Sequence, residues 1–360
     1  MDINTINRIV WWIPFKQLRN DIREYLVYKV NIKKDIVNLN DNILNLRKDI
    51  DNIKTKYKIT DLWFINNYLI KDFLSNDNDL LNKYSKLING LDNESVEIVS
   101  NIVSALSNNN FHFTDNEIRI KEDLQKKHNN RIIKISDKRY IYSNKYILNQ
   151  NFFEFCNFYY NMDINYIKNV HFLKDKSIID AGAFIGDTAL ILSEYTNDKV
   201  YSFEPFSLNF KSLVENIKLN NKLNIEAVNM ALGDEDKYIE FLAPKVSRGD
   251  TSFVIEKDIY SEDKVTIKMT TLDSFVEKNN IKIGLIKADL EGFEQQFLRG
   301  ALNTIKQQKP VLMISIYHSY SDFFDIKPMI EKLNLGYKFK VVKPNDFGII
   351  GETKLIAEVY

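Results

Sequence analysis

The sequence predicts an α/β protein built on an open sheet, and two observations support this. Residues 177–205 read in turn as an apolar strand, a glycine-containing turn, a helical pattern and a second apolar strand. From there to residue 360, short apolar runs keep alternating with helical patterns, as is typical of α/β folds. Polar side chains follow five predicted strands: Asp180, Glu204, Asn229, Asp289 and His318. Open α/β sheets bind ligands at the carboxyl edge of their strands, so we expect the site at that edge.

The first strand–turn–helix–strand unit has the layout of a nucleoside-binding site. Gly182 has no Cβ, so the backbone can approach a ligand closely at this point. Glu204, at the end of the next strand, can accept two hydrogen bonds from the 2′ and 3′ hydroxyls of a ribose. Each such charged hydrogen bond is worth roughly 1.5–3 kcal/mol.

The residues of the turn narrow the choice of nucleoside. A dinucleotide fingerprint needs glycine where Phe184 and Asp187 stand, and a P-loop needs lysine where Gly186 is followed by Asp187 and Thr188. Asp180 and Asp187 add negative charge where a phosphate would lie. S-adenosylmethionine fits better, because its ammonium and sulfonium groups are cationic. The alternative is an ordinary α/β turn with a structural glycine.

Composition sets limits on the class of protein. The chain of 360 residues is long enough for two domains, and it is 44% hydrophobic and 27% charged. Basic and acidic residues both number 49, so net charge gives no argument for nucleic-acid binding. The single cysteine, Cys156, excludes an internal disulfide framework and suits a reducing compartment. The 4 widely spaced histidines predict no histidine metal cluster. We expect a cytoplasmic protein.

The first thirty residues have features of a membrane-surface segment. Trp11 and Trp12 are flanked by the basic residues Arg8, Lys16 and Arg19. The apolar run 9–15 is too short to span a bilayer and lacks a signal-peptide pattern. One interpretation is peripheral contact with the inner face of the membrane. The other is that both tryptophans pack on a neighbouring domain or subunit.

A heptad pattern follows from residue 32. Ile36, Ile43 and Ile50 occupy position a, and Leu39 and Leu46 occupy position d. Isoleucine at a with leucine at d favours a parallel two-stranded coiled coil, so we expect a homo-oligomer. The pattern lasts only about three heptads, and a long helix packed on its own chain is the alternative.

Four regions are therefore predicted: an amphipathic segment and coiled coil (1–60), a helical region (61–130), a lead-in that covers the ligand site (131–176) and a ligand-binding domain (177–360). Within the last, we expect a helix over 208–219 and a helix that begins near Thr271. The further predicted strands are 225–228, 238–242, 265–269, 283–288, 311–317, 339–342 and 355–359.

Several of these stretches resemble the FkbM family of S-adenosylmethionine-dependent methyltransferases. They are IIDAGAFIGDTALIL, VYSFEP, ALGD, TLDSF and above all IKADLEGFE, within residues 177–318. Ala181 departs from the family, which usually has a β-branched residue there. The resemblance implies a class I, Rossmann-like methyltransferase sheet of seven strands with an antiparallel last strand, here preceded by an α-helical N-terminal region with a coiled coil. It also implies O-methylation of a hydroxyl on a sugar, glycan or related natural product, such as a surface polysaccharide or glycolipid.

The turn and the resemblance together give the predicted cofactor-binding residues. They are Asp180, Gly182, Ala183, Phe184, Gly186, Asp187, Thr188, Glu204, Pro205, Asn229, Met230 and Asp289. In such folds Asn229 would bond the adenine edge and Met230 would cover one of its faces.

The predicted catalytic residues are His318, Asp289 and Glu291. His318 is the first choice for the base that takes the hydroxyl proton, because histidine titrates near neutral pH. Asp289 is the rival base, or binds the methionine ammonium, and Glu291 positions substrate or orients Asp289. We expect no metal, although Asp289, Glu291 and Glu294 together offer hard oxygen ligands for Mg²⁺.

Two other functions remain open at this point. A non-catalytic scaffold would keep the fold and use its coiled coil to organise partners. A nucleic-acid methyltransferase is the less favoured alternative, because charge is balanced and no basic aromatic stripe is present in the sequence.

Overall fold

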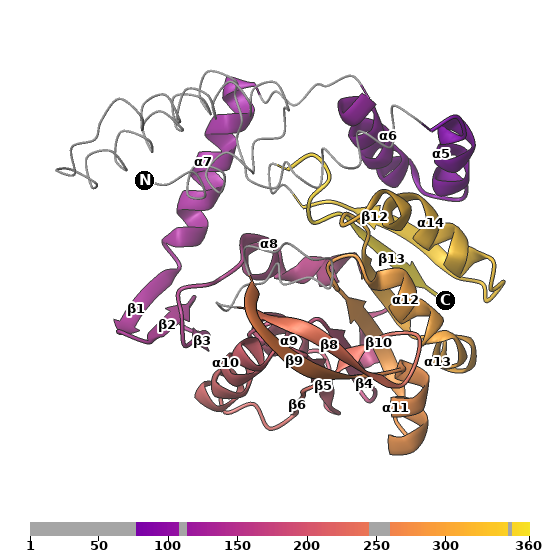
Figure 1. Cartoon of the computed structure of the whole chain (residues 1–360). Coiled ribbons are helices and arrows are strands. Elements are labelled where there is room, and N and C mark those ends of the chain that lie inside the picture. The colour runs from indigo at the N-terminus through magenta and orange to yellow at the C-terminus, as the bar shows by residue number, and fades with distance from the viewer. Residues whose placement is uncertain (1–76, 108–113, 245–259, 345–347) are drawn as a thin grey trace, which may run out of the picture.

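The computed structural model describes residues 77–107, 114–244, 260–344 and 348–360 (Figure 1). The predicted membrane-surface segment and coiled coil, within residues 1–60, lie outside the described residues and stay predictions. No helix among the described residues is both long and apolar enough to cross a membrane.

A mixed sheet of seven strands forms the centre of the molecule, in the order β12-β13-β11-β10-β4-β5-β6. Its strands are β4 (Ser177–Ala181), β5 (Val200–Phe203), β6 (Ile225–Val228), β10 (Ile283–Ala288), β11 (Val311–Ser315), β12 (Lys338–Val342) and β13 (Lys354–Glu358). β13 runs antiparallel to both of its neighbours, whereas the other pairs are parallel. The predicted strands 225–228 and 283–288 are confirmed with the same bounds. β11 ends at Ser315, two residues before the predicted end.

Both faces of this sheet are buried at β4, β10, β11 and β13, which explains the mainly apolar runs in these strands. Adjacent residues point to opposite faces, so Ile179 and Ile286 join one hydrophobic cluster while Ile178 and Leu285 join the other. The first cluster includes residues of α5 (Leu80–Ile88), α6 (Asn93–Ser107), α11 (Leu272–Asn279), α12 (Glu294–Arg299), α13 (Leu302–Gln308) and α14 (Tyr320–Glu331). The second includes residues of α8 (Phe155–Tyr159), α9 (Asp187–Leu192) and α10 (Ser207–Leu219).

Two smaller sheets flank the central one. Strands β7 (Ala231–Leu232), β8 (Lys237–Pro244) and β9 (Tyr260–Thr270) form a sheet in the order β7-β9-β8. It contains the predicted strands 238–242 and 265–269. Strands β1 (Ile132–Ser136), β2 (Arg139–Tyr142) and β3 (Tyr146–Leu148) form an antiparallel meander just before the central sheet.

The described part of the predicted helical region divides into two. Figure 1 shows α5 and α6 beside α14 and β12. There the ammonium of Lys327 donates to the carbonyls of Asn89 (2.6 Å) and Lys86 (3.2 Å). Helix α7 (Asp115–Asn129) begins with a capping box at Thr114. Near its end, Nε2 of His128 donates to the carbonyl of Phe153 at 2.8 Å. This region therefore covers two separate parts of the domain rather than forming a bundle of its own.

Candidate active site

The predicted site residues gather where β4, β5, β10 and β11 end, because parallel strands bring their carboxyl ends to one edge. The turn after β4 contains Gly182 and Phe184, and both are partly exposed at this edge. The loop after β10 contains Asp289 and Glu291, and His318 follows β11. Residues more than a hundred positions apart thus share one rim, as the sequence predicted.

The glycine turn is fitted against the loop after β10. Gly182 has φ +79°, and a Cβ on it would lie 1.9 Å from the carbonyl oxygen of Asp289. The amide of Asp289 donates to the carbonyl of Ala181 at 3.1 Å. The sequence predicted a close approach at Gly182 to a ligand. In the structure the closest approach is to protein backbone, which fixes the turn relative to Asp289.

Several predicted cofactor residues lie beneath the turn rather than at its open side. Asp180 is fully buried, and both its oxygens accept from the hydroxyl of Thr188, at 3.0 and 2.9 Å. The ammonium of Lys287 lies 3.3 Å from Asp180 and donates to the carbonyl of Gly182 at 2.8 Å. Burial lowers the pKa of Lys287, but the carboxylates of Asp180, Asp289 and Asp187 outweigh it and the net shift is upward.

Lys287 was not found from the sequence. The signal that would have found it is a lysine in the middle of an otherwise apolar strand. Such a lysine needs a buried partner, because an unpaired buried charge is costly.

Glu204 lies at the end of β5, as predicted, but the residue is buried and only 4% exposed. It accepts from the amides of Phe184 (3.0 Å) and Phe206 (2.9 Å). Burial raises the pKa of Glu204 to about 8, although these backbone donors act in the opposite direction. A ribose would have to share or replace the contacts that Glu204 makes here.

The predicted adenine contacts lie next to Glu204. The side-chain amide of Asn229 donates to the carbonyls of Glu204 (2.8 Å) and Pro205 (3.1 Å). Pro205 and Asn229 line a cavity of about 250 Å³ together with Tyr238 and Ile267. Met230 is half-buried against the main hydrophobic cluster. The cavity is lined by none of the residues after β10 or β11, so it adjoins the rim without containing its acidic residues.

Residues 151–160 of the lead-in contact the turn, and the role of the lead-in as a cover of the ligand site stays a prediction. The ring of Phe152 meets that of Phe184 edge to face, with centroids 5.1 Å apart. The amide of Asn157 donates to both Glu154 (2.6 Å) and Asp187 (2.9 Å). Burial raises the pKa of Asp187 to about 6.

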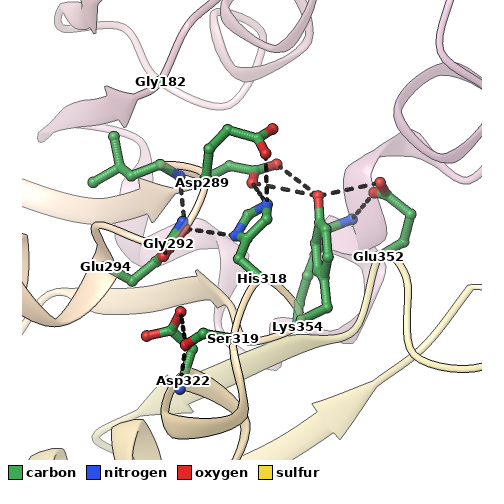
Figure 2. Close-up of polar contacts among 12 residues, drawn as sticks. Gly182, Asp289, Gly292, Glu294, His318, Ser319, Asp322, Glu352 and Lys354 are labelled. Carbon is green, nitrogen blue, oxygen red and sulfur yellow. Dashed lines mark hydrogen bonds and ion pairs between the residues drawn. The ribbon is translucent and has the colours of Figure 1, made fainter. Parts of the chain in front are cut away.

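An acidic cluster surrounds His318 (Figure 2). Nδ1 of His318 lies 2.9 Å from Oε1 of Glu294, and Nε2 lies 3.3 Å from Oδ1 of Asp289 and 3.5 Å from Oε2 of Glu291. The amides of Leu290 and Gly292 donate to the Glu294 carboxylate at 2.7 and 3.0 Å. Glu294, predicted as a possible Mg²⁺ ligand, is fully buried and instead shapes the loop that presents Asp289 and Glu291.

Charge governs the protonation of this cluster. Burial alone would lower the pKa of His318, but the carboxylates of Glu294, Glu291 and Asp289 raise it well above the usual value. Burial acts to raise the pKa of Asp289, but His318, Lys287 and Lys354 lower it overall.

Two further groups next to the cluster were not found from the sequence. The hydroxyl of Tyr317 donates to Asp289 (3.4 Å) and to Glu352 (3.3 Å). The ammonium of Lys354 is paired with Asp163 at 2.8 Å. Burial raises the pKa of Tyr317, and the surrounding carboxylates raise it further. The buried hydroxyl of Tyr317 thus joins Asp289 of the rim to Glu352, which lies in the turn before β13.

Comparison with known proteins identifies the domain that carries this rim. Residues 180–339 match the family described as the methyltransferase FkbM domain. Residues 180–339 are a methyltransferase FkbM domain. The resemblance in the turn and in the loop after β10 is therefore confirmed, and the enzyme class is methyltransferase.

Two curated proteins are similar to about half of the chain. "Methyltransferase 1" of Beauveria bassiana is 26% identical over 193 residues, which cover 48% of this chain and 77% of that protein. "Hexuronic acid methyltransferase AglP" of Haloferax volcanii is 25% identical over 179 residues, which cover 49% of this chain and 71% of that protein.

A solved structure shares the fold. The methyltransferase FkbM from Methylobacillus flagellatus KT matches with a TM-score of 0.51 and 17% identity, over 79% of this chain and 60% of that one. This likeness supports the α/β methyltransferase-like fold of the FkbM domain and says nothing more about its substrate.

Proposed function

We propose that this protein transfers a methyl group from S-adenosylmethionine to a hydroxyl oxygen of a sugar or glycan. The observation that carries the proposal is the rim, in which an FkbM domain brings its glycine turn into direct contact with Asp289. The similarity to a protein named as a hexuronic acid methyltransferase supports a sugar as acceptor.

The residues present fit the methyl donor. Gly182 and Phe184 are partly exposed, so the donor can reach the turn. Glu204 and Asn229 would bind its nucleoside, and the carboxylates of the rim, such as Asp289, suit its cationic groups. When bound, S-adenosylmethionine supplies a methyl group activated by its sulfonium. Beneath the turn, Asp180 and Thr188 would keep the donor site in shape rather than contact the ligand.

Asp289 is the better placed of the two predicted bases. Its side chain is 25% exposed, whereas that of His318 is 2% exposed, so an acceptor hydroxyl reaches Asp289 more readily. We assign Asp289 to accept the hydroxyl proton, with His318 as a positioning residue behind it. Holding the hydroxyl about 3 Å from the reacting methyl would supply much of the acceleration.

The test is transfer of a labelled methyl group to a panel of glycans and nucleotide sugars, with RNA as a further arm. We expect a labelled ether on a sugar hydroxyl, and we expect Asp289→Asn to lower turnover about 100-fold. Donor affinity measured by calorimetry should change only a few-fold. If affinity falls and turnover at saturating donor is retained, Asp289 binds the donor instead. Labelled RNA alone, or no donor binding, would contradict the proposal.

Asp322→Asn is a matched control. Asp322 is buried next to the cluster, where Gln295 donates to it at 3.1 Å, but it lies outside the rim proposed to carry the reaction. We expect this variant to keep its turnover, because the amide oxygen of asparagine can still accept from the hydroxyl of Ser319, which in turn accepts from the main-chain amide of residue 322.

A further inference from the structure

We infer that Asp289, Glu291 and His318 form a binding site for one divalent transition-metal cation. One ligand atom from each residue can be chosen so that all lie within 4.8 Å of one another. The three residues come from the loop after β10 and from the residue that follows β11 by three positions, so the sheet itself sets their spacing.

The distances within this group fit shared coordination better than hydrogen bonding. Nε2 of His318 lies 3.3 Å from Asp289 and 3.5 Å from Glu291. Charge-assisted hydrogen bonds between nitrogen and oxygen are shorter, about 2.7–2.9 Å. Two ligand atoms that are each about 2.1 Å from a cation lie about 3.0 Å apart at a right angle and about 3.4 Å apart at a tetrahedral angle. The observed separations fall near this range.

The second, independent observation is the state of His318. Its side chain is 2% exposed, yet Nε2 has no hydrogen-bond partner among the residues that the structure describes. Buried polar atoms normally have a partner, so this nitrogen calls for an explanation. It points toward the two carboxylates, as Figure 2 shows for Asp289.

The other ring nitrogen is held as in a metal-bound histidine. Nδ1 lies 2.9 Å from Glu294, whose carboxylate is itself fixed by the amides of Leu290 and Gly292. Metal-ligating histidines almost always donate their second N–H to a carboxylate or carbonyl, which sets the ring orientation. Glu294 therefore takes this supporting position and leaves the ligand positions to the other two acids.

The ligand types indicate the class of cation. Two carboxylates with one imidazole suit Mn²⁺, Fe²⁺ or Zn²⁺, whereas Mg²⁺ prefers oxygen ligands alone. Asp289 and Glu291 are 25% and 22% exposed, so the site opens toward solvent. Three protein ligands leave further positions on the cation. An acceptor hydroxyl bound at one of them would pass its proton to the second oxygen of Asp289 more readily. This last step rests on the proposed function, whereas the metal site does not.

The test uses the full chain after chelator treatment, with Mn²⁺ alone as the probe. We expect one Mn²⁺ per chain by calorimetry, and electron spin-echo spectra that show nitrogen coupling from an imidazole. His318→Gln should abolish that coupling, and Glu291→Gln should weaken Mn²⁺ binding tenfold or more. Asp322→Asn, which removes a carboxyl charge near Glu294 but no proposed ligand, should bind Mn²⁺ normally.

The outcomes separate the two proposals. Absence of Mn²⁺ binding, binding without nitrogen coupling, or equal weakening in the Asp322→Asn control would overturn the metal site, provided that circular dichroism shows a folded chain. Methyl transfer that persists after chelation would leave the proposed function standing and would exclude a role for the metal in it. Mn²⁺ binding with the expected coupling supports the site whether or not an acceptor has been found.

Discussion

Two groups of acidic residues at this edge of the sheet differ in burial and in the partners of their carboxylates. Beneath the turn, Asp180 is fully buried and is paired with Thr188 and Lys287. Beyond β10, Asp289 and Glu291 are partly exposed and share His318, whose outer nitrogen lacks a hydrogen bond among the described residues. The contrast teaches that an acid at a strand end is structural where the neighbouring strand brings it a cation, and is available for chemistry where the loop opens to solvent.

The largest effect is expected when the buried Asp180 loses the ammonium of Lys287, its charged partner. Lys287→Met leaves Asp180 buried without its charged partner, so we expect a loss of about 3–5 kcal/mol in the free energy of unfolding. Urea denaturation measures this. The double variant Lys287→Met with Asp180→Asn should recover most of the loss. Lys264→Met, which breaks an exposed pair with Glu240, should be indistinguishable from wild type.

The contact between the turn after β4 and the loop after β10 can be tested at Gly182. In Gly182→Ala the new Cβ would meet the carbonyl oxygen of Asp289, so we expect a loss of about 3 kcal/mol in stability and no measurable donor binding. Gly336→Ala is the control, because Gly336 also has a positive φ (+85°) but has no atom within 4 Å of its added Cβ. It should lose about 1 kcal/mol and keep activity. Equal losses in both variants would mean that backbone strain, not the contact, matters at Gly182.

Glu204 provides a pH-dependent test of how the protein binds S-adenosylmethionine. With a pKa of about 8, it is mostly protonated at pH 7 in the free protein. A ribose diol donates to the ionised form, so binding at pH 7 must first release a proton. Donor affinity should therefore rise about tenfold as the pH is raised from 7 to 9. Calorimetry in two buffers should detect proton release at pH 7. Glu204→Gln should remove the pH dependence, and a wild-type affinity that is flat with pH would contradict the ribose assignment.

The smallest effect is expected where the lead-in touches the turn. Phe152→Ala removes an edge-to-face ring contact with Phe184, which is worth about 1 kcal/mol. Donor affinity should fall about fivefold with the fold intact. Leu223→Ala, at a side chain that is 92% exposed, serves as the control. If Phe152→Ala binds the donor like wild type, the lead-in does not support the turn.

Local patterns predicted most of the fold. The central strands β4, β10 and β11 were found because burial on both faces gives nearly uninterrupted apolar runs. The helix that begins after Thr271 was found from its cap, and the hydroxyl of Thr271 does accept from the amide of Ser274 at 3.0 Å. The rim itself was predicted because the carboxyl ends of parallel strands meet at one edge.

Partners set by strand register could not be predicted. Lys287 stands directly opposite Asp180 in the parallel pairing of β10 with β4, and no pattern along one strand reveals which residue lies beside it. For the same reason Asp180 looked available to a ligand when it is closed off. Glu294 was one of three acids that together offered oxygen ligands for Mg²⁺, although no metal was expected. In the structure its carboxylate accepts from the main-chain amides of Leu290 and Gly292. The contact between His318 and Glu294 joins the segment after β11 to the first residue of α12, and only the assembled sheet brings these two segments together.

The contact between Gly182 and Asp289 also limits which amino-acid substitutions this rim can accept during evolution. The atom that would obstruct a side chain at position 182 is a main-chain oxygen, which every residue type has. No replacement at position 289 can therefore make room for a larger residue at 182. A strain carrying Gly182→Ala should regain function only by true reversion or by changes that re-route the loop, and a selection for revertants should return no compensating substitution at position 289.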